Sequence, residues 1–104
     1  MIFLRISCKN ESIVEQIGNM LLKEKLIIDV NIHRNIERMV YANDVHQKES
    51  VTLLTSKTKG LLFSKIDESI RAQFPNENLE IYSIPIVHMD WEDMKHIKED
   101  VQGV

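Results

Sequence analysis

The stretch Leu79-Glu80-Ile81-Tyr82-Ser83-Ile84-Pro85-Ile86-Val87-His88-Met89-Asp90 decides how the rest of the chain is interpreted. It is the most apolar run in the second half of the sequence, which predicts one long strand over 79–90. Asp90, at its end, can cap a following helix by accepting a hydrogen bond from a free first-turn amide. The other predicted elements can be ordered around this strand.

Apolar residues spaced three and four apart predict two helices before this strand. The first covers 13–25, and either Asn10 or Ser12 can cap it. The second carries its apolar stripe on Leu62, Ile66, Ile70 and Phe74 and is ended by Pro75. A last helix follows Asp90, with a weak apolar side formed by Trp91, Met94, Ile97 and Val101.

The remaining apolar segments predict strands. They cover 2–6, 26–32 and 50–56, with a bend or bulge at His33-Arg34-Asn35 and a turn at Asn43-Asp44. The segment 38–42 is also extended and can continue the same bent strand as 26–32. The order β-α-β-β-α-β with a trailing helix is that of an α+β, ferredoxin-like sandwich with a four-stranded antiparallel sheet. Two right-handed crossovers place both long helices on one sheet face. We therefore expect another copy of the chain to cover the second face.

The composition limits the class of protein. The 104 residues suit a single domain over 1–104, and the net charge of -3 disfavours a nucleic-acid partner. No apolar run approaches the roughly 20 residues that span a bilayer, so no membrane role is expected. The first residues lack the features of a signal peptide, and Cys8 is the only cysteine, which together favour a reducing cytoplasm.

Two short patterns could carry chemistry. His88-x-Asp90 supplies a nitrogen and an oxygen ligand and could begin a metal site, or it could be a polar strand end with a helix cap. Lys57-Thr58-Lys59-Gly60 precedes a helix and could hold an anion there, or it could be a charged loop. Cys8 has no evident histidine partner in the sequence, so we propose no thiol nucleophile, no catalytic residue and no enzyme activity. A small enzyme with Cys8 or a histidine as general base is the remaining alternative.

Several of these pieces together make the chain resemble the CutA-type divalent-ion tolerance proteins, which belong with the PII-like signalling trimers. The matching positions are Ser7, Asn10-Glu11, Glu24-Lys25-Leu26, Val30-Asn31, Lys57-Thr58, Pro75, Glu80, Pro85, His88 and Asp90. The sequence departs from the family pattern at Asp29, Val40, Ala42, Val51, Phe74, Asn76 and Leu79. Several of these departures replace polar groups linked with metal binding, so the chain resembles a divergent member.

The resemblance implies a homotrimer with a binding or regulatory role in divalent metal (copper) ion tolerance or homeostasis, and it implies the trimer more strongly than a copper site. Lys57 and Glu80 are then candidates for the lining of a ligand cleft between subunits, and His88 and Asp90 for a Cu or Zn site. The alternative is a PII-like or ACT-like sensor of a small anionic metabolite, with Lys57 and Lys59 as anion contacts.

Overall fold

The computed structural model describes residues 1–103. The elements are β1 (Ile2–Cys8), α1 (Glu11–Lys23), β2 (Asn31–Ala42), β3 (Val45–Thr58), a short 3-10 turn (Gly60–Leu62), α2 (Phe63–Gln73), β4 (Glu80–Pro85) and α3 (Trp91–Asp100). The strands form one antiparallel sheet in the order β2-β3-β1-β4. This confirms the predicted ferredoxin-like α+β fold with its C-terminal helix.

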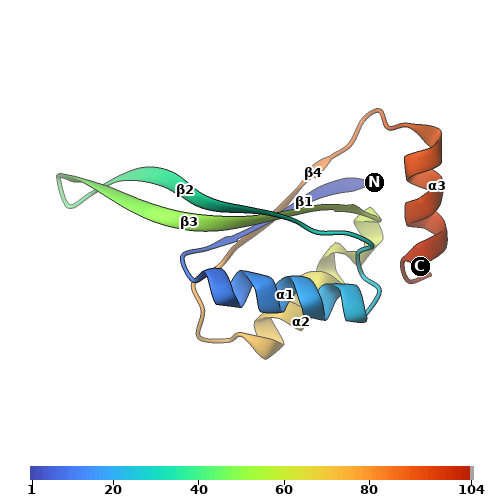
Figure 1. Ribbon diagram of the computed structural model, residues 1–104, viewed down its shortest axis with the longest axis horizontal. Coiled ribbons are helices and arrows are strands. Elements are labelled where there is room, and N and C mark those ends of the chain that lie inside the picture. The colour runs from blue at the N-terminus through green and yellow to red at the C-terminus, as the bar shows by residue number, and fades with distance from the viewer. Residues whose placement is uncertain (104) are drawn as a thin grey trace.

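The sheet has one covered face and one open face. α1 and α2 lie side by side below the sheet in Figure 1, and α3 stands at the end away from the hairpin tip. The covered face carries alternate residues of the central strand, Leu4, Ile6 and Cys8, all of which are buried. They pack with Leu54 of β3 and with the apolar stripes of the helices in a single core.

The opposite face, here called the open face, carries the other alternate residues of each strand. Strand pairing places the following residues on it: Phe3, Arg5, Ser7, His33, Ile36, Arg38, Val51, Leu53, Thr55, Lys57, Glu80, Tyr82 and Ile84. Tyr82 and Ile84 remain 44% and 46% exposed. No helix of residues 1–103 covers this face, as the sequence predicts.

Strands β2 and β3 form a hairpin that extends well beyond the rest of the sheet (Figure 1). β1 pairs with β3 only from Thr52 to Thr58, so the outer half of the hairpin is a two-stranded ribbon. The predicted turn is confirmed: Asn43 and Asp44 have φ of 54° and 59°, the signs that a type I′ turn requires. The predicted bulge is confirmed between His33 and Ile36, with Asn35 in the left-handed region.

The predicted strand over 26–32 is wrong for its first five residues, since β2 begins only at Asn31. Lys25 adopts φ of 57° and ends α1 in a Schellman motif, with Leu26 N donating to Leu21 O at 3.0 Å. The segment that follows bonds to side chains instead of joining the sheet: Thr58 Oγ1 donates to Leu26 O at 2.7 Å and Ser56 Oγ to Asp29 O at 2.8 Å. Its apolar residues therefore reach the core without a strand.

The predicted long strand over 79–90 is also too long. β4 ends at Pro85, which pairs with Ile2, the first residue of β1. Beyond Pro85 the pairing with β1 ends, and only Ile86 N still donates to Met1 O, at 3.1 Å. Val87 is 82% exposed, so its apolar character does not bury it in the core.

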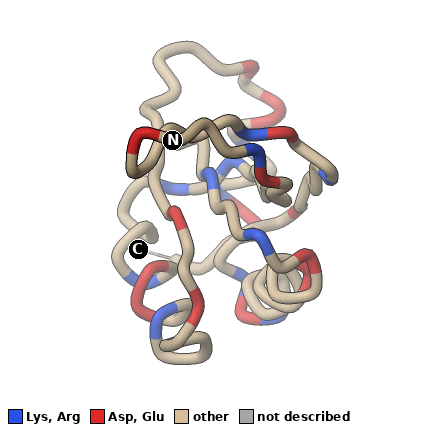
Figure 2. The backbone as a smooth tube through the Cα atoms, turned by 90° about the vertical axis from the view of Figure 1, so that its left-hand side faces the viewer, with Lys and Arg blue, Asp and Glu red and all other residues tan. Residues whose placement is uncertain are grey.

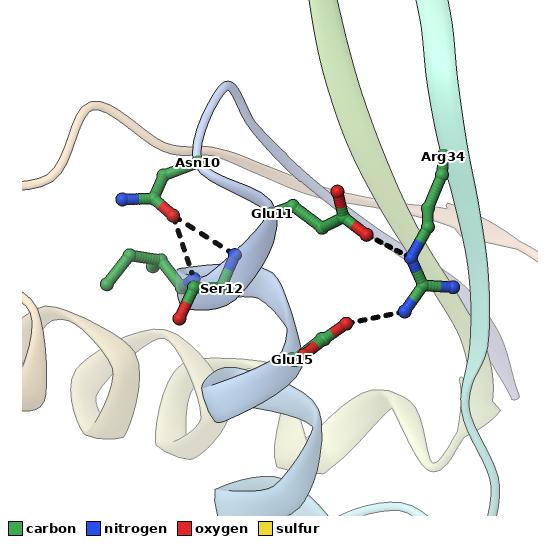
Figure 3. Close-up of polar contacts among 6 residues, drawn as sticks. Asn10, Glu11, Ser12, Glu15 and Arg34 are labelled. Carbon is green, nitrogen blue, oxygen red and sulfur yellow. Dashed lines mark hydrogen bonds and ion pairs between the residues drawn. The ribbon is translucent and has the colours of Figure 1, made fainter.

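Asn10 caps α1, and replacing it tests this capping role directly. Its Oδ1 accepts from Ser12 N at 3.0 Å and Ile13 N at 3.3 Å (Figure 3). We expect Asn10→Ala to lower the free energy of unfolding by about 1 kcal/mol. Ser12→Ala is the control, because Ser12 Oγ only accepts from the Gln16 side chain. Equal urea midpoints for Asn10→Ala and Ser12→Ala would contradict the capping role.

Candidate functional site

The predicted metal pair lies in the connection between β4 and α3. His88 and Asp90 are both exposed. Asp90 caps α3, because its Oδ2 accepts from Asp93 N at 3.4 Å, as predicted from the sequence. Within residues 1–103 no group of three or more His, Cys, Asp or Glu side chains could hold a metal ion. One chain therefore offers the pair His88 and Asp90 without a third protein ligand.

The two predicted cleft residues lie at opposite ends of β1. Lys57 lies opposite Phe3 in the sheet, and Glu80 lies opposite Ser7. Phe3 and Ser7 are four residues apart on β1, a separation of roughly 13 Å at 3.3 Å per residue. The structure thus does not bring Lys57 and Glu80 together. It does bring Lys57 close to the metal pair, because Lys57 Nζ and Asp90 Oδ2 both contact Asp93.

The two lysines of the alternative anion site already have partners in the chain. Lys57 Nζ forms an ion pair with Asp93, which ties β3 to α3. Lys59 Nζ donates to Gln102 O at 2.9 Å. Lys57 therefore has a counter-charge within the chain, whereas the partner of Lys59 is a neutral carbonyl oxygen.

Glu80 belongs to a charged network on the open face. Arg38 of β2 pairs with Glu80 of β4 and lies 3.6 Å from Glu49 of β3, and Lys9 Nζ lies 2.6 Å from the second Glu49 oxygen. The network crosses three strands and the loop after β1. Its two basic and two acidic side chains balance in charge. Figure 2 shows acidic and basic residues interspersed along the chain as a whole.

Two adjoining cavities lie over this network, with volumes of about 270 and 240 Å³. They share Ser7, Arg38, Val51 and Glu80. The larger one also includes Cys8, which is buried and whose Sγ accepts from Asn10 N at 3.4 Å. The smaller one includes Arg5 and Tyr82. The sequence-based candidates include Glu80 but not Arg5, although an arginine within an apolar strand was a signal available in the sequence.

A second charged cluster joins β2 to α1. Arg34, beside the bulge, reaches Glu11 and Glu15 in the first turns of the helix (Figure 3). The hydrogen bonds that Arg34 donates to Glu15, and next to Glu11, raise the pKa of Arg34 above its ordinary value. The guanidinium therefore stays protonated. All three side chains are about half exposed, so the cluster orients the hairpin base more than it stabilises the fold.

The fold defines the class of protein: a small ferredoxin-like sandwich whose outer sheet face no helix of residues 1–103 covers. The model of the CutA1 divalent ion tolerance protein family matches residues 2–100. The chain therefore belongs to the CutA1 family, as its sequence resemblance predicts.

Individual relatives agree with this assignment. Protein CutA homolog of Xenopus laevis is 27% identical over 81 residues, which are 78% of this chain and 54% of that protein. The matched region thus spans about half the length of this relative. Among solved structures, the divalent cation tolerance protein Cut A1 of Thermus thermophilus has a TM-score of 0.84 at 24% identity, covering 98% of this chain and 100% of its own. CutA1 of Oryza sativa has a TM-score of 0.86 at 21% identity, covering 99% and 94%.

Among residues 1–103, no helix combines the length and the apolar character needed to cross a membrane.

Proposed function

We propose that this chain is a non-catalytic binding protein that acts in divalent-ion tolerance as a homotrimer in the cytoplasm. The observation that carries the proposal is the match of the CutA1 divalent ion tolerance model to residues 2–100. The copies associate through their open faces, where Tyr82 and Ile84 leave apolar surface in water. The cation, copper or zinc, binds at His88 and Asp90.

The shape of the chain supports association between copies. Its principal extents are 48 × 29 × 20 Å, and the longest reflects the protruding ribbon of β2 and β3. A two-stranded ribbon is marginally stable by itself in water. Met39, Tyr41 and Val45 near its tip are 74%, 63% and 53% exposed. Packing the ribbon against a neighbouring copy removes this apolar surface from water and fixes the ribbon.

Assembly also completes the metal site. His88 and Asp90 supply two ligands, whereas zinc sites in proteins usually have three or four protein ligands. The exposed connection that carries the pair can meet donors from a neighbouring copy. Lys57, held near the pair through Asp93, and Glu80, in the open-face network, then line or support the clefts between copies.

Multi-angle light scattering tests the assembly. At micromolar concentration we expect a mass three times that of the 12.2 kDa chain. A mass of one chain at this concentration would contradict the proposed trimer.

Thermal unfolding with added metal tests the site. We expect Cu(II) or Zn(II) to raise the unfolding temperature of the wild type, because an ion that binds only the folded state stabilises it. His88→Ala removes the nitrogen ligand and should abolish the shift. His96→Ala is the control, since His96 is an exposed histidine on α3 outside the pair. A shift that persists in His88→Ala, or is absent from the wild type, contradicts the site.

A further inference from the structure

Lys59 keeps its positive charge without an acidic partner. Its Nζ donates to Gln102 O at 2.9 Å and forms no ion pair within residues 1–103, whereas Lys57, two residues earlier, is paired with Asp93. The Lys59 side chain is partly buried, and an ammonium group carries three N–H donors. An anion that reaches Lys59 therefore supplies both a counter-charge and a further hydrogen-bond acceptor.

Lys98 of α3 is a second lysine of this kind. Its ammonium group has no acidic partner among the described residues 1–103, and it lies 5.6 Å from the centre of the Trp91 ring. An aromatic ring attracts an ammonium group but does not cancel its charge. Trp91 is itself 64% exposed, so an incoming ligand can reach this pair.

One cavity has both lysines in its wall. It is formed by Met1, the 3-10 turn and α3, has a volume of about 410 Å³ and is lined by Met1, Lys59, Gly60, Leu61 and Lys98. This volume lies within the range of ligand sites, roughly 300 to 1,000 Å³. Leu61 is 80% exposed, and no carboxylate belongs to the lining. The cavity adjoins α3, at the end of the molecule away from the hairpin tip (Figure 1), and none of its lining residues is among the open-face residues.

The side chains of the lining restrict the ligand. The two ammonium groups are donors without acceptor capacity, and the side chains of Met1 and Leu61 are apolar. A sugar, an amino acid or a peptide brings N–H or O–H donors for which these side chains offer no oxygen acceptor. A ligand with one anionic end and an otherwise apolar body leaves no donor unpaired.

We propose that this cavity, the α3 cavity, binds a medium-chain fatty acid. The carboxylate lies between Lys59 and Lys98, and the acyl chain packs on Met1 and Leu61. All lining residues belong to one chain, and neither residue of the metal pair is among them. The site therefore rests neither on the proposed trimer nor on the proposed metal pair.

The test is a titration of the full chain with octanoate, followed by NMR through the backbone amides of Gly60 and Leu61 and the indole N–H of Trp91, the single tryptophan of the sequence. We expect saturable shifts of all three signals, because a carboxylate bound at Lys98 changes the position of the ammonium group over the Trp91 ring. Octanamide has the same chain without the charge, and we expect it to bind about tenfold more weakly.

Lys98→Gln should weaken octanoate binding about tenfold. Lys95→Gln is the matched control, because Lys95 is an exposed lysine of the same helix that does not line the cavity. It should leave the affinity unchanged. Lys59→Gln is a second variant and should also weaken binding, which keeps the test decisive if either variant alone disturbs the fold.

Absence of saturable octanoate binding to the wild type overturns the proposal, as does octanamide binding as tightly as octanoate. Wild-type affinity in both Lys98→Gln and Lys59→Gln has the same meaning. If the amides of Leu53 and Tyr82 on the open face shift as strongly as that of Leu61, octanoate binds as a detergent and the site is wrong. Saturable binding to a protein that light scattering shows to be a single chain supports the α3 cavity while contradicting the trimer.

Discussion

Leu54→Ala is expected to lower the free energy of unfolding by about 2–5 kcal/mol, the range found when a large buried aliphatic side chain is truncated. Leu54 is fully buried on β3, beside Ile6 of the central strand. Its Cδ1 would lie 3.4 Å from a Cβ built on Gly18 of α1, so helix and sheet are in close contact there. A cavity at this position removes contacts to both layers, and neither layer can move in to fill it without disturbing the other.

Chemical unfolding at a fixed protein concentration measures this effect, since assembly would make the apparent stability depend on concentration. Leu61→Ala is the matched control. Leu61 is 80% exposed, so the same truncation should change the unfolding free energy by less than about 0.5 kcal/mol. If the two variants unfold at the same denaturant concentration, Leu54 is not in the core that this fold requires.

Leu53→Glu is expected to convert the proposed trimer into monomers. Leu53 immediately precedes Leu54 on β3, and its side chain lies half-buried on the open face. If this face is the contact between copies, the substitution places a carboxylate without a partner in each copy of the interface. Burying such a charge costs several kcal/mol per site even after relaxation, which is enough to dissociate a small oligomer.

Light scattering of Leu53→Glu should give the 12.2 kDa mass of one chain, while circular dichroism should show that the fold is kept. Leu22→Glu provides the control. Leu22 lies on α1 and is 38% exposed, on the helical layer that the proposed contact does not use. It should leave the mass at three chains. A trimeric Leu53→Glu would mean that the copies meet through another surface.

Local signals made much of the fold predictable. The start of α1 is fixed by the capping side chain of Asn10. The hairpin turn at Asn43-Asp44 and the bulge near Asn35 depend on residues that tolerate the left-handed conformation. All of these effects act within a few residues. Helical periodicity identified both long helices. The order of elements, and with it the uncovered sheet face, followed from these local features and from the handedness of the crossovers.

The two errors in the strands have non-local causes. The apolar segment from Leu26 has the composition of a strand, but the hydroxyls of Ser56 and Thr58 bond to its carbonyl groups. β4 stops at Pro85 because β1, its partner, begins only at Ile2. In both cases the deciding group lies more than 20 residues away in sequence, beyond the reach of a pattern read along the chain.

The site was predictable only in part, for the same reason. The cap at Asp90 is local and was found. The pairs Lys57–Asp93 and Arg38–Glu80 are set by tertiary contacts, so neither partner could be assigned from spacing. The predicted metal pair and the predicted cleft role of Glu80 remain predictions, to be decided by the measurements described above.

The position of β1 has a consequence for how the protein is made. β1 lies in the interior of the sheet, and its two neighbours, β3 and β4, are synthesised after it, at residues 52–58 and 80–85. Until Pro85 has emerged, the nascent chain carries a strand with an open edge, which is a surface for mispairing. β1 is paired on both edges only once β4 has been made, so fragments truncated before Glu80 should aggregate instead of persisting as folded intermediates.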